Sequence, residues 1–339
     1  MDLQKIKNKE KQFLSLTSLY VAEFDELLVC FSTRWQSYFK YHHVRDGRRR
    51  SKPLTAKQLQ RPTSSLSTDG DKLFFILYFF KNNHLQEALA MQFEMDQGHI
   101  SRWIKRLMPV LSQSIKDLHL QPARTMDELV CLFRSRQRMD NPAGVGKAQS
   151  VHLDATERSI ARNTDQDAQK QDYSGKQHGH TLKNTVLCDE FQFIHFAGFT
   201  HRGAISDVKM ARQELPTLEG LGNDTIIATK DKGYQGYRPE GVFHFEPYKA
   251  ARNQPIDGLE ELVNSAISSI RIVCEHAIGG VKRLRILKDQ LRYHNSDFRD
   301  QIFGIACGIH NLRVSRRKNT YSNGALRVRA RINLNFYGT

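Results

Sequence analysis

Residues 151–158 read Val-His-Leu-Asp-Ala-Thr-Glu-Arg, and the first part of this stretch predicts a β-strand over 151–156 that carries Asp154. A second predicted strand, at 225–229, is followed two residues later by Asp231. Open α/β sheets place their active sites beyond the carboxyl ends of their strands, so two central strands of one sheet would bring these aspartates together. A single aspartate more often caps a turn or a helix, so neither residue is informative alone.

The elements predicted around these strands follow the order of an α/β fold. In chain order they are a polar stretch at 157–179, strands at 181–188 and 192–199, a helix at 204–215, the strand at 225–229, a strand at 241–247, and helices at 259–287 and 297–313. This order matches the ribonuclease H-like fold, a mixed sheet with flanking helices.

The long predicted helix supplies a third acidic side chain. At ~100° per residue, Glu275 lies ~40° and Lys282 ~20° from Arg271, so these three share one narrow face. An exposed Arg–Glu pair at this spacing is commonly only a weak surface ion pair. The catalytic alternative is a carboxylate that brings metal to a phosphate backbone and gains from the cations beside it.

Three carboxylates from two strands and one helix fit two-metal phosphoryl transfer. That chemistry needs acidic side chains that hold two ions ~3.5–4 Å apart. Magnesium takes only one or two carboxylates per ion and completes its shell with water and phosphate oxygens. Asp154, Asp231 and Glu275 meet this requirement, although the pattern is not unique to it.

The overall charge predicts a polyanionic partner. Lys and Arg number 51 against 36 Asp and Glu, which gives a net charge of +15 and a pI near 9.6. Such a field attracts DNA, RNA or anionic membrane, and the alternative is a basic surface that only keeps the protein in solution. No apolar run approaches the ~20 residues of a spanning helix, and residues 1–12 lack a signal-peptide core, so we expect no membrane association.

The cysteines indicate the compartment. Five are scattered along the chain without a Cys-x-x-Cys pair, which argues against a disulfide framework and a structural zinc. We therefore expect a cytoplasmic protein, associated with the nucleoid if the source is bacterial.

The N-terminal part is predicted to be all-helical. Apolar residues recur at helical spacing over 5–43, and a basic linker follows at 45–52, either solvated or a phosphate-contacting arm. Helices are predicted at 69–81, 85–93 and 97–107, with a three-residue turn between the last two. Helix, tight turn and second helix form a helix-turn-helix arrangement, whose second helix enters the DNA major groove. Plain helical packing is the alternative.

The 97–107 helix has one apolar and one polar face. Ile100, Trp103, Ile104 and Leu107 form the predicted buried stripe. The candidate DNA-contacting residues on the other face are Gln97, His99, Ser101, Arg102, Lys105 and Arg106.

Composition divides the chain into four predicted segments. Gly144-Val145-Gly146 marks a boundary near residue 146. The segments are a helical N-terminal segment with its basic linker (1–52), a helix-turn-helix DNA-binding domain with a connector (53–145), the catalytic domain (146–315) and a basic tail (316–339).

The catalytic part resembles the DDE transposases of the insertion-sequence and Harbinger-like types. The matching blocks are 152–158, then 173–176 running into 180–184, then Asp-Lys-Gly-Tyr-Gln-Gly at 231–236, and 271–282 with Arg-x3-Glu-x6-Lys spacing. Their order and spacing cover residues 150–312, and Ile-Ser-Arg-Trp-Ile at 100–104 resembles the helix-turn-helix domain of these enzymes. The tyrosine that opens the family's helix signature is Ser268 here, and the family's His-Asp pair is Ser206-Asp207, where Asp207 is expected to begin a helix.

The resemblance implies the site residues and the reaction. It implies that Asp154, Asp231 and Glu275 ligate two Mg²⁺ ions per active site, for which Mn²⁺ would substitute. Arg271 and Lys282 would contact DNA near the cut, and Lys176 is a further candidate DNA contact. The implied reaction is hydrolysis at terminal inverted repeats, followed by attack of the freed 3′ hydroxyl on target DNA.

The resemblance also implies a homodimer or larger synaptic assembly on double-stranded DNA. Two other functions stay open. One is a domesticated transposase that acts as a sequence-specific DNA-binding protein, and the other is a nonspecific nuclease of the same fold.

Overall fold

The computed structural model describes residues 3–43, 47–55, 58, 66–140, 149–221, 225–229, 234, 236–245, 257–258 and 272–316. The chain divides into two compact units, one formed by Met1–Gln121 with Val281–Arg313 and the other by Pro122–Gly280 with Val314–Thr339. The division therefore falls between Gln121 and Pro122, whereas the boundary predicted near residue 146 lies outside the described residues.

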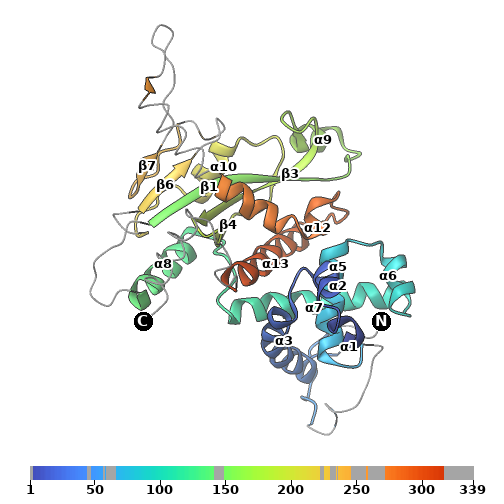
Figure 1. Ribbon diagram of the computed structural model, residues 1–339. Coiled ribbons are helices and arrows are strands. Elements are labelled where there is room, and N and C mark those ends of the chain that lie inside the picture. Colours follow the sequence, from blue (N-terminus) through green and yellow to red (C-terminus); the bar gives the residue numbers. More distant parts are fainter. Residues whose placement is uncertain are drawn as a thin grey trace. The chain divides into compact units, whose positions relative to one another are not determined.

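The described part of the first unit is built from helices (Figure 1). They are α1 (Leu3–Lys7), α2 (Glu10–Thr17), α3 (Val21–Tyr41), α5 (Asp69–Asn82), α6 (Gln86–Gln92), α7 (Gln97–Asp117), α12 (Arg285–Lys288) and α13 (Ser296–Ser315). The region over 5–43, which was predicted to be helical, thus contains three helices.

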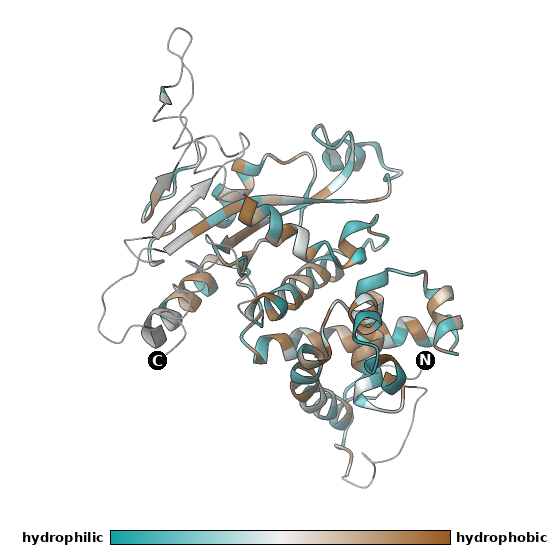
Figure 2. Ribbon diagram, viewed as in Figure 1, coloured by the Kyte–Doolittle hydropathy of each residue, from teal (hydrophilic) through white to brown (hydrophobic). Residues whose placement is uncertain are grey.

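Helix α5 lies at the centre of this unit. Its residues from Lys72 to Phe80 are all buried, because an apolar run that covers the whole circumference of a helix can only be accommodated inside a core. Phe74 of α5 packs on Phe13 of α2, whose ring meets Phe24 of α3 edge to face with centroids 5.2 Å apart. In Figure 2 helix α7 carries both apolar and polar segments, as an amphipathic helix at the edge of such a core does.

The start of α5 is fixed by a capping box. Thr68 Oγ1 accepts a hydrogen bond from the Asp71 amide at 3.0 Å, and the Asp71 carboxylate accepts one from the Thr68 amide at 3.0 Å. These contacts satisfy two helix-end amides that otherwise have no partner in the helix.

We expect Thr68→Ala to lower the free energy of unfolding by about 1 kcal/mol, because the cap acceptor is lost. Thr33→Ala is the matched control, since Thr33 is exposed and only donates back to the Val29 carbonyl of its own helix. Its effect is expected to stay within about 0.5 kcal/mol. Equal urea midpoints for the two variants would contradict a role for the cap.

The second unit contains a mixed seven-stranded sheet among its described residues. The strands are β1 (Gln149–Ser159), β2 (Tyr173–Ser174), β3 (Gly179–Asp189), β4 (Ile194–Ala197), β5 (His201–Arg202), β6 (Thr225–Thr229) and β7 (Phe243–Phe245). Their order is β2-β3-β1-β6-β7, and β4 and β5 also pair with β3. β1 is antiparallel to β3 but parallel to β6, and β6 is parallel to β7.

β1 is longer than predicted. Residues 157–159, expected to open a polar stretch, continue the strand, and helix α9 (Gln166–Asp172) follows. The polar side chains of β1 have partners inside the unit: Thr181 donates to Glu157 at 2.8 Å, and buried Arg158 donates to Asn184 at 2.7 Å. A strand can therefore carry Glu157 and Arg158 without an apolar pattern, because each has a hydrogen-bond partner on β3.

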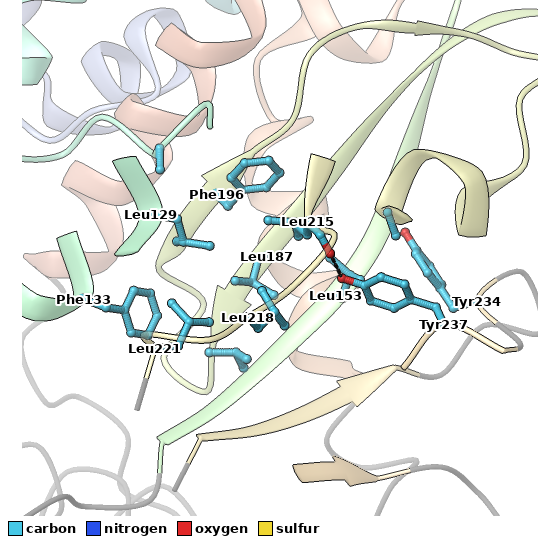
Figure 3. Packing of buried hydrophobic residues seen from close by; sticks show 13 residues of the cluster. Leu129, Phe133, Leu153, Leu187, Phe196, Leu215, Leu218, Leu221, Tyr234 and Tyr237 are labelled. Atoms are coloured by element: carbon cyan, nitrogen blue, oxygen red, sulfur yellow. Dashed lines mark hydrogen bonds between the residues drawn. The ribbon is translucent and has the colours of Figure 1, made fainter. Parts of the chain in front are cut away.

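The core of the second unit lies against one face of β1 and β3 (Figure 3). The cluster combines residues of α8 (Met126–Asp140) and of the sheet with Ala211 of α10 (Asp207–Glu214) and the segment after that helix. The Tyr237 hydroxyl closes it by donating to the Leu215 carbonyl at 2.7 Å. Since Leu153 and its partner Leu187 face this core, the side chains at 152 and 154 point to the opposite face of β1.

None of the helices in the described ranges has the length and apolar character needed to cross a membrane.

Candidate active site

Asp154 lies where the parallel pairing of β1 ends. β1 and β6 pair from Gln149↔Thr225 to Leu153↔Thr229, while the pairing of β1 with β3 continues to Ser159. Asp154 is therefore central in the full strand, although it is the first residue beyond the described β1–β6 ladder. Its carboxylate is half-buried, and Oδ1 accepts a hydrogen bond from the Ala155 amide at 2.8 Å. This is the carboxyl end of a parallel pair, the usual position of active sites in open α/β sheets.

Helix 272–281 packs on the face of β1 that carries Asp154. The Cys274 thiol is buried, and its Sγ lies 3.8 Å from the His152 carbonyl oxygen. A hydrogen bond with Cys188 and burial raise the pKa of this thiol, and the carboxylates of Asp154 and Glu275 raise it further. The helix that carries Glu275 is thus packed against the strand that carries Asp154.

Tyr234 connects the segment after β6 to the same place. Its side chain is 2% exposed. Burial raises the pKa of the hydroxyl well above its ordinary value, and the negative charges of Asp154 and Asp207 add to this effect. The hydroxyl has no hydrogen-bond partner among the residues that the structure describes. The Tyr234 hydroxyl is therefore a buried, neutral donor with unused hydrogen-bonding capacity.

The donor chemistry fits a hard divalent cation. Asp154 and Glu275 offer carboxylate oxygens, which Mg²⁺ and Mn²⁺ prefer, and the buried Tyr234 hydroxyl can bond a water or an oxygen ligand of the ion. Within the described ranges, no group of three His, Cys, Asp or Glu side chains has the arrangement of a metal site. Asp231, the third predicted ligand, lies outside those ranges.

The structure does not place the two predicted cations, Arg271 and Lys282, on the helical face of Glu275. Arg271 lies outside the described residues. The helix ends at residue 281, so Lys282 lies in the turn that precedes α12, and the prediction of one helix through 287 is wrong. The tandem glycines Gly279 and Gly280 explain the early end, because each costs about 1 kcal/mol relative to Ala in a helix. Lys282 therefore does not share the helical face of Glu275.

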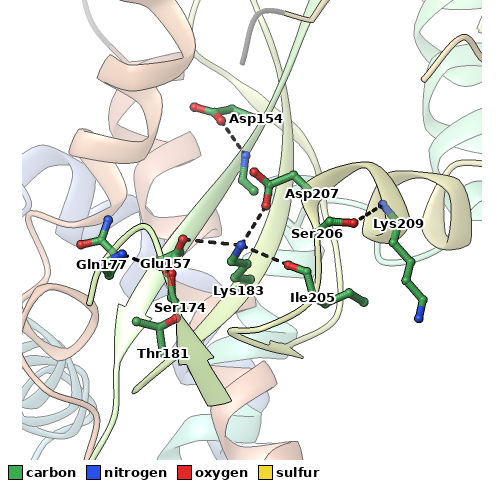
Figure 4. Close-up of polar contacts among 11 residues, drawn as sticks. Asp154, Glu157, Ser174, Gln177, Thr181, Lys183, Ile205, Ser206, Asp207 and Lys209 are labelled. Atoms are coloured by element: carbon green, nitrogen blue, oxygen red, sulfur yellow. Dashed lines mark hydrogen bonds and ion pairs between the residues drawn. The ribbon is translucent and has the colours of Figure 1, made fainter. Parts of the chain in front are cut away.

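A buried charge cluster on the other face of β1 was not foreseen from the sequence. Lys183 Nζ lies 3.6 Å from Glu157 Oε1 and 3.2 Å from Asp207 Oδ1 (Figure 4). Asp207 begins α10, with Ser206 as the N-cap residue, which confirms its predicted place at a helix start. Glu157 and Lys183 are direct partners in the β1–β3 register. The pair could have been predicted only from this strand register, because neither residue stands out in the sequence of its own strand.

The candidate DNA-contacting residues lie mainly on the outside of α7. Gln97, His99, Arg102 and Lys105 are exposed, Ser101 is half-buried, and Lys176 is exposed in the turn between β2 and β3. Two of the exposed side chains also have local partners. Gln97 donates to Glu87 of α6 at 3.1 Å, and His99 lies 3.3 Å from Asp96.

Arg106 was predicted on the outer face of α7, and that placement is wrong because the side chain is only 7% exposed. α7 continues to Asp117, and Val110 on the next turn extends the buried stripe. Arg106 lies four residues before Val110, ~40° around the helix, and so falls on the buried side.

A comparison with protein families found a match for the catalytic part of the chain. Residues 153–311 match the family model described as DDE superfamily endonuclease. The match begins in β1, one residue before Asp154, and ends in α13. It supports a DDE transposase-like nuclease domain, a class that generally uses divalent metals. The searches of curated proteins and of solved structures found no match.

Proposed function

We propose that this protein is a DNA transposase of the insertion-sequence or Harbinger-like type, with a ribonuclease H-like catalytic domain and an N-terminal helix-turn-helix region. The observation that carries the proposal is the packing of the helix that carries Glu275 against the strand that carries Asp154, where Cys274 Sγ lies 3.8 Å from the His152 carbonyl oxygen. Asp154 lies just beyond the β1–β6 ladder, and both it and Glu275 lie inside the segment that matches a DDE endonuclease. A DNA-cutting reaction is the chemistry that this class of domain and this acidic pair have in common.

Asp231 is the proposed third ligand. Thr229, two residues before it, pairs with Leu153, the neighbour of Asp154. Tyr234, three residues after it, has its hydroxyl near Asp154. Because two residues of chain span at most ~7 Å, the pairing of Thr229 supports a position for Asp231 close to Asp154.

Each residue has a separate part in the proposed reaction. Two Mg²⁺ or Mn²⁺ ions, when bound, would activate the attacking oxygen and stabilise the leaving one. Asp154, Asp231 and Glu275 would hold these ions on one face of β1. Tyr234 would orient a water or a carboxylate through its hydroxyl, which its raised pKa keeps protonated at neutral pH.

The proposed partner is double-stranded DNA. A net charge of +15 favours binding to the phosphate backbone, and the exposed residues of α7 are the proposed readers of the terminal inverted repeats. Joining 3′ ends to target DNA requires two ends in one complex, so we propose a homodimer or larger synaptic assembly. The proposed place of action is the cytoplasm, on the nucleoid in a bacterial cell.

The decisive test is cleavage of a labelled duplex that carries the terminal repeat of the element. Magnesium, manganese and a chelator are compared, with a duplex that lacks the repeat as control. The proposal expects metal-dependent cuts at the repeat end and none in the control. Binding without cuts under any divalent ion would favour the domesticated DNA-binding protein, and equal cutting of both duplexes would favour the nonspecific nuclease.

The role of α7 is tested by Arg102→Ala and Lys105→Ala. We expect each to weaken repeat binding by about 1–3 kcal/mol if it reads a base, or to lower the salt slope by about one unit if it contacts phosphate. Lys116→Ala is the matched control. Lys116 is exposed on the same helix ~16 Å beyond Lys105, and base-reading residues of such helices lie near the N-terminal end. Unchanged affinity in both variants would show that α7 is not the reader.

A further inference from the structure

Lys183 is a buried cation close to the proposed metal ligands. It lies in β3 directly opposite Glu157 of β1. Its Nζ lies 3.6 Å from Glu157 Oε1 and 3.2 Å from Asp207 Oδ1, and it donates to the Ile205 carbonyl at 3.1 Å (Figure 4). The side chains of Lys183, Glu157 and Asp207 are 9%, 10% and 14% exposed. The ammonium is therefore surrounded by three oxygens that are largely shielded from water.

The same three oxygens would suit a divalent ion. Carboxylate and carbonyl oxygens are the ligands that Mg²⁺ and Mn²⁺ take in proteins. Glu157 lies three residues from Asp154 on β1. Asp154 and Glu157 thus lie close together on β1, with their side chains on opposite faces of the strand.

We propose that Lys183 is a positioning residue: its ammonium occupies the cation position between Glu157 and Asp207 and so restricts divalent ions to Asp154, Asp231 and Glu275. The identity of those three ligands rests on the proposed function. A buried carboxylate is stable only when it is paired or protonated, so Glu157 and Asp207 would capture another cation if the lysine were absent. Lys183 prevents that capture and also ties the start of α10 to β3.

The first test counts bound Mn²⁺ by electron paramagnetic resonance in the full-length chain. The parent carries Asp154→Asn and Glu275→Gln, which removes proposed ligands of the catalytic ions. Adding Lys183→Met is expected to create one new Mn²⁺ site per chain, and adding Asp207→Asn to that variant is expected to abolish it. A folded Lys183→Met variant with the same Mn²⁺ count as its parent would overturn the proposal.

The second test uses the otherwise unchanged chain. The Mg²⁺ concentration for half-maximal nicking is expected to rise about 10–100-fold in Lys183→Met. Losses of metal affinity of this size are usual when a residue that orients the metal ligands, but does not bind the metal, is replaced. Lys183→Arg keeps a cation at this position and is expected to restore most of the wild-type Mg²⁺ dependence. Equal Mg²⁺ dependence of the Met variant and the wild type would reduce Lys183 to a packing role.

A third variant covers the case in which Lys183→Met does not fold. Asp207→Asn alone, with Lys183 present, is expected to bind as many Mn²⁺ ions as the wild type, because Asp207 is held by the lysine. Loss of an ion would make Asp207 a metal ligand and overturn the inference. The proposed function fails on a different readout, since the wild-type chain would then neither lose Mn²⁺ on Asp154→Asn nor cut DNA.

Discussion

Asp154→Asn is expected to abolish metal-dependent cutting of the repeat duplex while the variant still binds the duplex with wild-type affinity. The substitution keeps the size of the side chain and removes the negative charge that would hold an ion at the end of the β1–β6 ladder. Metal ions contribute several kcal/mol of charge stabilisation to phosphoryl transfer, so the rate should fall on the order of 10³-fold or more. Nicking of an end-labelled repeat and a gel-shift titration measure the two properties separately.

Two further variants test whether the effect is specific to the proposed metal ligands. Glu275→Gln should lose cutting to a similar extent, because Glu275 is the second proposed metal ligand and lies on the helix that packs against β1. Asp189→Asn is the matched control: Asp189 lies at the end of β3 and bonds His195 at 2.9 Å, outside the proposed metal site. Its effect should appear in thermal stability rather than in metal dependence. Normal cutting by Asp154→Asn would remove the basis of the transposase proposal.

Phe196→Ala is expected to lower the free energy of unfolding by about 3–5 kcal/mol, the largest effect on stability that we predict. Phe196 is 0% exposed in β4, where it pairs with Leu187 inside the core of the second unit. Truncation would leave a cavity between the sheet and α8 that rigid strands cannot close. Urea unfolding followed by circular dichroism gives the magnitude.

Phe199→Ala is the control for this prediction. Phe199 is 47% exposed, and its ring lies 4.8 Å beneath the Arg124 guanidinium. Loss of one such contact should cost about 0.5–1 kcal/mol. Both tryptophans, Trp35 and Trp103, lie in the first unit, so tryptophan fluorescence would miss an effect confined to the second. Similar midpoints for the two phenylalanine variants would contradict the assignment of Phe196 to the core.

The sequence predicted those elements whose own residues define them. The strand at 225–229 matches β6 residue for residue, because its apolar run is bounded by polar turn residues on both sides. The start of α5 was predicted from its capping signal, and the box Thr68–Asp71 confirms it. Asp154 could be proposed from the end of its predicted strand alone, and the structure places it at the end of the β1–β6 ladder.

Other features depend on contacts that no local pattern contains. The extension of β1 through Glu157 and Arg158 follows from polar partners on β3, which only the strand register reveals. α7 continues past Pro109 because Val110, Leu111 and Ile115 extend its buried stripe, and burial outweighs the hydrogen bond that the proline lacks. The same extension buried Arg106. Lys183 was missed for a related reason, because its candidate role depends on its contacts with Glu157 and Asp207, which lie on other elements.

The parallel ladder between β1 and β6 also has a consequence for the order in which the second unit folds. β1 and β3 form an antiparallel pair whose nearest paired residues, Ser159 and Thr181, are 22 positions apart, whereas Leu153 and Thr229 of the parallel pair are separated by 76. Closing the longer loop costs more chain entropy, and the stabilising contacts between β1 and β6 form only after the intervening strands are in place. We therefore expect amides of β3 to gain protection from hydrogen exchange before those of β6 during refolding. Asp154 would then be positioned early and the chain leading to Asp231 late, so that the proposed metal-dependent activity would be acquired only in the last step of folding.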